Sequence, residues 1–243
     1  MMRRVSFGRG WRWIADAFAL FRRAALIWIV LSMIMLLLAL ALSMIPVLGS
    51  YLLYLLTPLL LGGLMVAARD TEAGQEIEIA HLFRGFVENA TQLVTVGGVY
   101  LVGNVIIAGF ALSLGGEDLR QVLQAAAAGR PEDVDPAAAN RASVAVLVAA
   151  ALFLPLAMIV WFAPALVILE KVPAWRAMSL SLRACLVNVL PFLLYVAVMS
   201  VLLLVALALV VVGLALWVPL AILSAYTAYR DIFGAPVPLS ERT

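Results

Sequence analysis

No charged residue interrupts residues 24–68, AALIWIVLSMIMLLLALALSMIPVLGSYLLYLLTPLLLGGLMVAA, a run of 45 residues. Three more stretches without Asp, Glu, Lys or Arg follow, of 28, 28 and 46 residues: 89–116, 142–169 and 184–229. One helix needs about 20 apolar residues to cross the roughly 30 Å hydrocarbon core of a membrane. Each 28-residue stretch therefore predicts one span, and each long stretch predicts two. We expect six membrane-spanning helices.

The composition of the chain supports this class. Of its 243 residues, 66% are hydrophobic and 12% are charged. A soluble domain carries about 25% charged residues, twice that fraction. The alternating strands of an outer-membrane barrel are not present in the sequence, so the spans must pair their backbone groups within helices. The predicted fold is all-α, a polytopic membrane protein with a single transmembrane domain over 1–243.

Turn residues divide the two long stretches into pairs of spans. In the first stretch, Ile45-Pro46-Val47-Leu48-Gly49-Ser50 predicts a turn. In the last stretch, Gly213 is the best candidate, and it would separate spans 189–211 and 213–229. Neither turn carries a charge, so both hairpins are expected to be tight on that side of the membrane.

The basic residues predict the orientation of the spans. Thirteen of the 16 Lys and Arg residues flank the spans on one side. The remaining three lie between the third and fourth spans: Arg120, Arg130 and Arg141. Because basic flanks stay in the cytoplasm, we expect both termini there, together with a C-terminal tail at 234–243. The loop at 115–141 is then expected to be periplasmic.

The predicted loop at 115–141 has two possible structures. Residues 117–128 have the pattern of a short helix that Gly129 would close. Asp135 and Pro136 have the pattern of an N-cap and a first-turn proline for a helix that enters the fourth span. The alternative is a flexible acidic loop. We favour the helical interpretation.

A segment of helical periodicity precedes each pair of spans. An aromatic–arginine dipeptide occurs in all three segments: Trp11-Arg12, Phe83-Arg84 and Trp175-Arg176. The first and third pairs of spans also end alike, in Ala68-Arg69-Asp70 and Tyr229-Arg230-Asp231. We interpret the chain as three units, each an amphipathic interfacial helix followed by a transmembrane hairpin, at about 8–70, 76–171 and 172–233. The alternative is that amphipathic helices of similar composition align this well without a true repeat.

The lead-in segments are expected to lie in the interfacial plane of the membrane. In the first segment, the expected apolar face consists of Trp11, Ile14, Phe18 and Phe21; in the second, it consists of Ile79, Leu82, Phe83, Phe86 and Leu93. His81 falls on the polar face and is expected to be solvated. The candidate contacts to anionic lipid headgroups are Arg12, Arg84 and Arg176, at about 1 kcal/mol each. Ordinary anchoring and topology are the alternative role of these arginines.

The predicted spans contain no ionisable residue. Proton-coupled carriers and ion pumps keep such residues in the membrane, and hydrolysis there needs paired acids, a base or a metal. We therefore expect that the chain is not an enzyme. Asn104 and Tyr226 are candidates for a polar pathway. Hydrogen bonding between helices, often worth only about 0.6 kcal/mol per bond, is the alternative that we favour.

Three further classes of site are not expected from the sequence. The single Cys185 permits no disulfide within the chain, and with the single His81 it permits no Cys or His cluster for a metal. We expect no cofactor. The basic residues are too few and too close to the membrane for a nucleic-acid surface.

Several motifs resemble those of a known family. They are Gly10-Trp11-Arg12-Trp13-Ile14, Ala80-His81-Leu82-Phe83-Arg84-Gly85-Phe86, Asn188 with Pro191-Phe192, and Ala228-Tyr229-Arg230-Asp231-Ile232-Phe233. Together they resemble a family of uncharacterised six-span inner-membrane proteins of proteobacteria, over the whole chain except the 115–141 loop. More remotely, the hairpins resemble the membrane domain of some glycerophosphodiester phosphodiesterases. The resemblance implies the topology above and a bacterial inner (cytoplasmic) membrane, and it supplies no activity.

The sequence therefore favours a non-enzymatic integral inner-membrane protein that acts as a scaffold, an accessory or a lipid-interacting protein. Its expected partners are membrane lipids, with a membrane protein or a second copy of the chain as a further possibility. The alternative function is a permease or export component for an apolar or amphipathic solute.

Reporter fusions test the predicted topology. Fusions at Gly49 and Gly129 should report the periplasm, and fusions at Gly74, Pro173 and the C-terminus should report the cytoplasm, because basic flanks remain inside. Alkaline phosphatase and green fluorescent protein give opposite signals on the two sides. A fluorescent fusion at Gly129 would contradict the arrangement.

Overall fold

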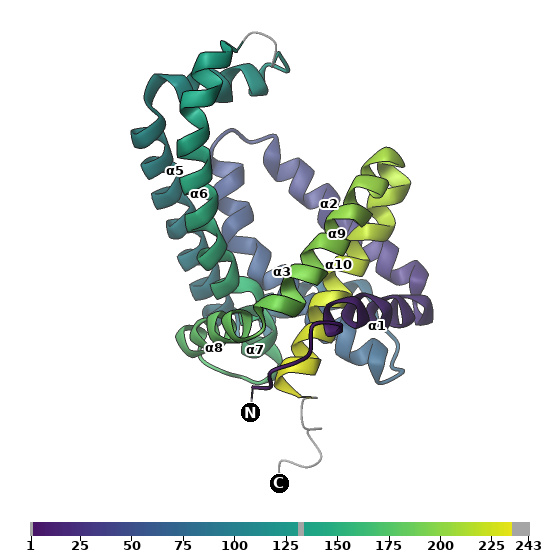
Figure 1. Cartoon of the computed structure of the whole chain (residues 1–243). Helices are drawn as coiled ribbons and strands as arrows, with labels where there is room; N and C mark the ends of the chain where they lie inside the picture. The colour runs from purple at the N-terminus through teal and green to yellow at the C-terminus, as the bar shows by residue number, and fades with distance from the viewer. Residues whose placement is uncertain (1, 131–133, 235–243) are drawn as a thin grey trace. The chain divides into compact units, whose positions relative to one another are not determined.

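The computed structural model of the chain describes residues 2–130 and 134–234 (Figure 1). All regular structure in these residues is helical. Six helical segments are long and apolar enough to cross a membrane: α2 (Ala25–Ser43), α3 (Leu48–Glu72), α5 (Ala90–Ala127), α6 (Pro136–Trp161) with α7 (Ala163–Leu169), α9 (Val189–Ala208) and α10 (Val210–Phe233). The predicted all-α class with six membrane-spanning helices is confirmed. Apart from Gly234, the predicted tail at 234–243 lies outside the described residues.

A shorter helical segment precedes each hairpin. These segments are α1 (Arg9–Arg23), η1 (Ile79–Phe83) with α4 (Arg84–Val87), and α8 (Ala174–Val187). The middle segment is one 3-10 turn followed by one α-helical turn, so it is shorter than the amphipathic helix expected there. Asn89, with a φ of 56°, separates it from α5.

The first hairpin turns where the sequence predicts a turn. Val47 has a φ of 63°, and α3 begins at the next residue. A Cβ on Gly49 would collide with the backbone of Leu42. Glycine at this position therefore lets α2 and α3 approach each other directly after the turn.

The last hairpin turns earlier than predicted. The break lies at Leu209, between the end of α9 and the start of α10. Gly213 lies inside α10, where a Cβ would collide with the backbone of Ala206. The prediction that Gly213 forms the turn is wrong, because this glycine provides close packing between the two helices instead.

The chain divides into two compact units, each of which is described by itself. Unit 1 comprises Met1–Gly98 and Ile159–Thr243, and unit 2 comprises Val99–Met158. Unit 2 has a small core that consists of Ala111, Leu119, Ala142 and Ala145. Small side chains at these positions let its two helices pack closely.

The loop predicted at 115–141 lies within unit 2. Gly116 interrupts α5 with a φ of 53° and a ψ of −137°, which is a glycine conformation, so the part up to Ala127 forms a separate short helix. Gly129, with a φ of 67°, follows it. Asp135 caps α6, since its Oδ1 accepts the backbone N–H of Ala137 at 3.1 Å. The helical interpretation of the loop is confirmed. Residues 131–133 lie outside the described residues.

In unit 1, α1 packs against α9 and α10 (Figure 1). The buried side chains of α1 are Trp13, Ile14, Ala17, Leu20 and Phe21. The apolar face expected from the sequence is divided, since Ile14 and Phe21 are buried in the protein whereas Trp11 is 56% exposed and Phe18 is 50% exposed. The buried stripe is rotated toward Trp13 since α1 packs on other helices of the protein.

Trp13 belongs to an aromatic cluster in unit 1 that centres on Phe192. The ring centroid of Trp13 is 5.2 Å from that of Phe192 and 6.1 Å from that of Tyr195. Phe162 and Trp161 extend the cluster, with their ring centroids 5.7 Å and 6.1 Å from that of Phe192. Edge-to-face pairs of this kind add about 0.5–1.5 kcal/mol each beyond the burial of their surface.

The segment before α1 is tied to distant parts of unit 1. The backbone N–H of Val5 donates to Oδ1 of the buried Asn188 at 2.9 Å, and Nδ2 of Asn188 donates to the carbonyl of Arg3 at 3.2 Å. The N–H of Arg3 donates to the carbonyl of Ile232 at 2.8 Å. These bonds join the beginning of the chain to the start of α9 and the end of α10.

Two glycines of unit 1 give a matched test of the packing. A Cβ on Gly63 of α3 would collide with the backbone carbonyls of His81 and Leu82, whereas a Cβ on Gly98 of α5 would meet nothing within 4 Å. Gly63→Ala should destabilise the protein by about 1–3 kcal/mol through overpacking. Gly98→Ala should be neutral or stabilise it by up to about 1 kcal/mol. Thermal unfolding in detergent, followed by tryptophan fluorescence, measures both, and a lower midpoint for Gly98→Ala than for Gly63→Ala would contradict the packing.

Candidate functional site

Charged and aromatic side chains of unit 1 gather where α3 and α10 end. Both helices continue beyond the uncharged stretches of the sequence, through Glu72 and Phe233. Their last turns carry acidic and basic residues that contact the lead-in segments. We call this group the charged belt; it consists of Arg9, Trp13, Arg69, Asp70, Glu72, His81, Arg84, Tyr226, Arg230 and Asp231.

Asp231 fixes α1 to the end of α10. Its Oδ2 accepts Nε of Arg9 at 2.7 Å and Nε1 of Trp13 at 2.8 Å, and its Oδ1 accepts Nη2 of Arg9 at 2.6 Å. The bidentate geometry is the strong form of an arginine–carboxylate pair. The hydrogen bond with Asp231 raises the pKa of Arg9 above its ordinary value. The guanidinium therefore stays charged.

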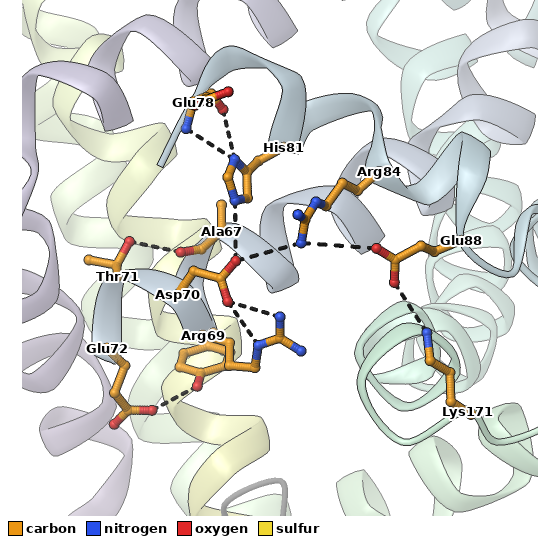
Figure 2. Close-up of polar contacts among 11 residues, drawn as sticks. Ala67, Arg69, Asp70, Thr71, Glu72, Glu78, His81, Arg84, Glu88 and Lys171 are labelled. Atoms are coloured by element: carbon orange, nitrogen blue, oxygen red, sulfur yellow. Dashed lines mark hydrogen bonds and ion pairs between the residues drawn. The ribbon is translucent and has the colours of Figure 1, made fainter. Parts of the chain in front are cut away.

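Asp70 fixes the second lead-in segment to the end of α3 (Figure 2). Nε2 of His81 lies 3.2 Å from Oδ2 of Asp70, and Nη1 of Arg84 lies 3.7 Å from the same oxygen. Oδ1 of Asp70 accepts Nε and Nη2 of Arg69 at 3.0 and 2.9 Å. The Asp70 side chain is only 7% exposed, so a cationic partner is required to offset the loss of its hydration.

The prediction that His81 is solvated is wrong. His81 is only 8% exposed. Its ring bridges Asp70 and the backbone of Glu78, whose N–H donates to Nδ1 of His81 at 3.0 Å. The side chains of the expected apolar face are partly at the surface of the protein. Ile79 and Phe83 are both 46% exposed, whereas Leu82 is fully buried. The pairing with Asp70 determines which side of this segment faces the protein.

Glu72 joins α3 to α10. The hydroxyl of Tyr226 donates to Oε2 of Glu72 at 2.7 Å, and Arg230 forms an ion pair with the same carboxylate. The neighbouring Thr71 accepts Nε1 of the buried Trp28 at 3.1 Å. The last turn of α3 therefore bonds to α10 and to α2 at the same level.

The two Arg-Asp motifs of the sequence have parallel structural roles. Asp70 ends the first predicted unit and holds the lead-in segment of the second. Asp231 ends the third predicted unit and holds the lead-in helix of the first. The middle unit ends differently, in Glu170, which accepts the hydroxyl of Tyr229 at 2.9 Å, and Lys171, whose Nζ lies 3.2 Å from Oε2 of Glu88. The repeat remains a prediction, and this parallel supports it for the first and third units.

The three arginines predicted to contact lipid headgroups lie on the surface of unit 1. Arg12 and Arg176 are exposed. The Arg84 side chain is 43% exposed and is shared between Asp70 and Glu88. The preceding aromatic residues are exposed as well, at 56% for Trp11, 46% for Phe83 and 70% for Trp175. All three aromatic–arginine dipeptides therefore present both side chains to the surroundings.

The two residues of the predicted polar pathway lie in different units. Asn104 belongs to unit 2 and donates to the carbonyl of Tyr100 in its own helix at 2.8 Å. Tyr226 belongs to unit 1, is fully buried and donates to Glu72. Tyr226 therefore bonds between helices, as the alternative favoured from the sequence expects, whereas Asn104 bonds within its own helix. The polar pathway stays a prediction.

Other side chains of unit 1 secure α8. The Ser181 hydroxyl accepts the backbone N–H of Phe162 at 2.9 Å, and Oε1 of Gln92 accepts the N–H of Ala174 at 2.8 Å. Burial raises the pKa of the Cys185 thiol to about 12, so this side chain is neutral and takes part in packing. Among the described residues, no group of three or more His, Cys, Asp and Glu is arranged to hold a metal ion.

Sequence reasoning did not identify Trp13 or Glu72 as members of the charged belt, nor the contacts that Asp70 and Asp231 make. The available signal was the Arg-Asp motif directly after two uncharged stretches. An Arg-Asp pair at the end of a span predicts a contact to a charged segment nearby. The periodicity of one helix does not identify which segment that is.

The spanning helices, the lead-in segments and the charged belt define an α-helical polytopic integral membrane protein. Over 198 residues the chain is 36% identical to a probable inner membrane protein of Burkholderia thailandensis, and the alignment covers 79% of this chain and 72% of that protein. The chain belongs to the family of that protein. No family model and no solved structure matches it.

The aspartate that holds α1 can be tested against a surface pair of the same type. Asp231→Asn should lower the free energy of unfolding by about 1–3 kcal/mol, because Arg9 and Trp13 lose a charged acceptor. Asp118 forms a similar bidentate pair with Arg141, which is 58% exposed, so Asp118→Asn should leave the unfolding midpoint unchanged. Equal midpoints for the two variants would show that the Asp231 contact does not stabilise the protein.

Proposed function

We propose that this protein is a non-enzymatic integral protein of the bacterial inner membrane that binds and organises lipids, with both termini in the cytoplasm. The observation that carries the proposal is the set of three exposed aromatic–arginine pairs on the lead-in segments of unit 1. In this function, Arg12, Arg84 and Arg176 bind phosphate groups, and the aromatic residues insert at the headgroup level.

The chemistry of these pairs supports a role at the membrane surface. Tryptophan and phenylalanine rings occupy the boundary between headgroups and acyl chains. An arginine near an anionic membrane surface contributes about 1 kcal/mol of attraction. Trp11, Phe83 and Trp175 each place an apolar ring beside such an arginine, so one pair addresses both parts of a phospholipid.

The fixed position of the lead-in segments favours organisation of lipids over simple anchoring. Asp231 holds α1, Asp70 holds the segment at 79–87, and Gln92 holds the start of α8. Because these segments are ordered before any lipid binds, less conformational entropy is lost on binding. A scaffold or accessory role beside a membrane-protein partner is compatible with the same surface.

Lipid retention tests the proposal. The protein is extracted in mild detergent from membranes that contain phosphatidylglycerol and phosphatidylethanolamine, and the bound lipid is quantified by mass spectrometry. The triple variant Arg12→Gln, Arg84→Gln, Arg176→Gln should bind phosphatidylglycerol with an affinity about 10- to 100-fold lower. The reason is that up to three contacts of about 1 kcal/mol disappear.

A matched control removes the same number of charges elsewhere. The triple variant Arg120→Gln, Arg130→Gln, Arg141→Gln should retain phosphatidylglycerol as the unmodified protein does. Equal loss in both triple variants, or an unmodified protein without a preference for phosphatidylglycerol, would refute the proposed site. Transport of an amphipathic dye by the reconstituted protein would instead support the permease alternative.

A further inference from the structure

An apolar groove runs between α1 and the α9–α10 hairpin in unit 1, with a cavity volume of about 200 Å³. Its lining includes Phe18 and Phe21 of α1, Val205 and Leu209 at the end of α9, and Leu216 and Trp217 of α10. Because α9 and α10 are long and apolar enough to cross a membrane, we expect the groove to open to the hydrocarbon of the bilayer.

The floor and walls of the groove are almost entirely apolar. Gly213 approaches the backbone of Ala206 closely, so the two helices meet with no side chain between them. Trp217 turns its indole N–H inward, where Nε1 donates to the carbonyl of Met199 at 3.1 Å. Its ring therefore presents only apolar surface to the groove. Along this length, the groove can select an occupant only by its hydrocarbon character.

A positive charge lies at the α1 end of the groove. The guanidinium carbon of Arg22 lies 5.4 Å from the ring centroid of Phe18, which lines the groove. Phe18 also stacks on the ring of Phe21, and the two ring centroids are 6.4 Å apart. The cation–π contact holds the Arg22 charge beside the end of the apolar channel. Hydrocarbon along the groove and a cation at its end match one phospholipid tail and its phosphate.

We propose that this groove is a binding site for one acyl chain of an anionic phospholipid, whose phosphate pairs with Arg22. The inference rests on the proposed lipid interaction but uses a separate site, because none of Arg12, Arg84 and Arg176 lines the groove. A site of this kind holds one lipid at a defined position, whereas the aromatic–arginine pairs contact the headgroup layer.

Photocrosslinking with labelled lipids tests the site. The full chain is reconstituted in phosphatidylcholine vesicles that contain a minor fraction of phosphatidylglycerol with a diazirine in its acyl chain, and crosslinked peptides are mapped by mass spectrometry. The phosphatidylglycerol probe should label residues 202–220 about five-fold more than the same probe on phosphatidylcholine, as one arginine–phosphate contact predicts.

Three variants separate the parts of the site. Arg22→Gln should abolish the difference between the two probes at residues 202–220 without affecting folding, since its side chain is exposed. Val205→Trp should fill the groove and remove labelling by both probes. Arg183→Gln, an exposed arginine of α8 outside the groove, should change neither result.

The outcomes distinguish this site from the proposed function. The triple variant at Arg12, Arg84 and Arg176 should leave the labelling of 202–220 unchanged, so the loss of one lipid interaction does not imply the loss of the other. Equal labelling by the two probes in the unmodified protein, or a preserved difference in Arg22→Gln, would overturn the inference. Absence of labelling at 202–220 by either probe in the unmodified protein would show that the groove holds no acyl chain and overturn it as well.

Discussion

A carboxylate at the end of a membrane-spanning helix needs charged or N–H partners, because neither lipid nor packed protein hydrates it. Asp70 and Asp231 obtain these partners from lead-in segments that belong to other hairpins of the sequence. The contact orients each segment about its own axis. Once Asp231 holds α1, Trp13 enters the aromatic cluster, and its carbonyl accepts the hydroxyl of Thr227 at 2.8 Å. Much of the packing in unit 1 depends on these two aspartates.

The same constraint divides the polar residues of unit 1 between two roles. The acidic side chains of the charged belt and their partners connect the elements of the protein, whereas Arg12 and Arg176 remain at the surface beside exposed aromatic rings. Arg84 takes part in both, since it contacts Asp70 and is partly exposed. A lead-in segment thus carries one face that specifies its position and one face that is free to meet lipid.

The membrane-spanning helices can be predicted from the sequence because a single physical rule, the exclusion of charge from hydrocarbon, sets their length and place. The helix before Gly129 and the cap at Asp135 follow from equally local rules. The position of His81 does not, because its burial results from a carboxylate on another helix. Gly213 shows the same limit, since a glycine that permits close helix contact and a glycine that makes a turn look alike in sequence. Tertiary contacts between segments far apart in the chain decide both cases.

The contact between Arg9 and Asp231 joins residues 222 positions apart, and this separation has a consequence for synthesis. At roughly 5–20 residues per second, α1 leaves the ribosome at least about ten seconds before its acceptor exists. During that interval the carboxylate that binds Arg9 and Trp13 is absent, although Phe192 and Tyr195 of α9, which pack on the Trp13 ring, are made before it. The last span to be made is therefore the one that completes the assembly begun by the first helix.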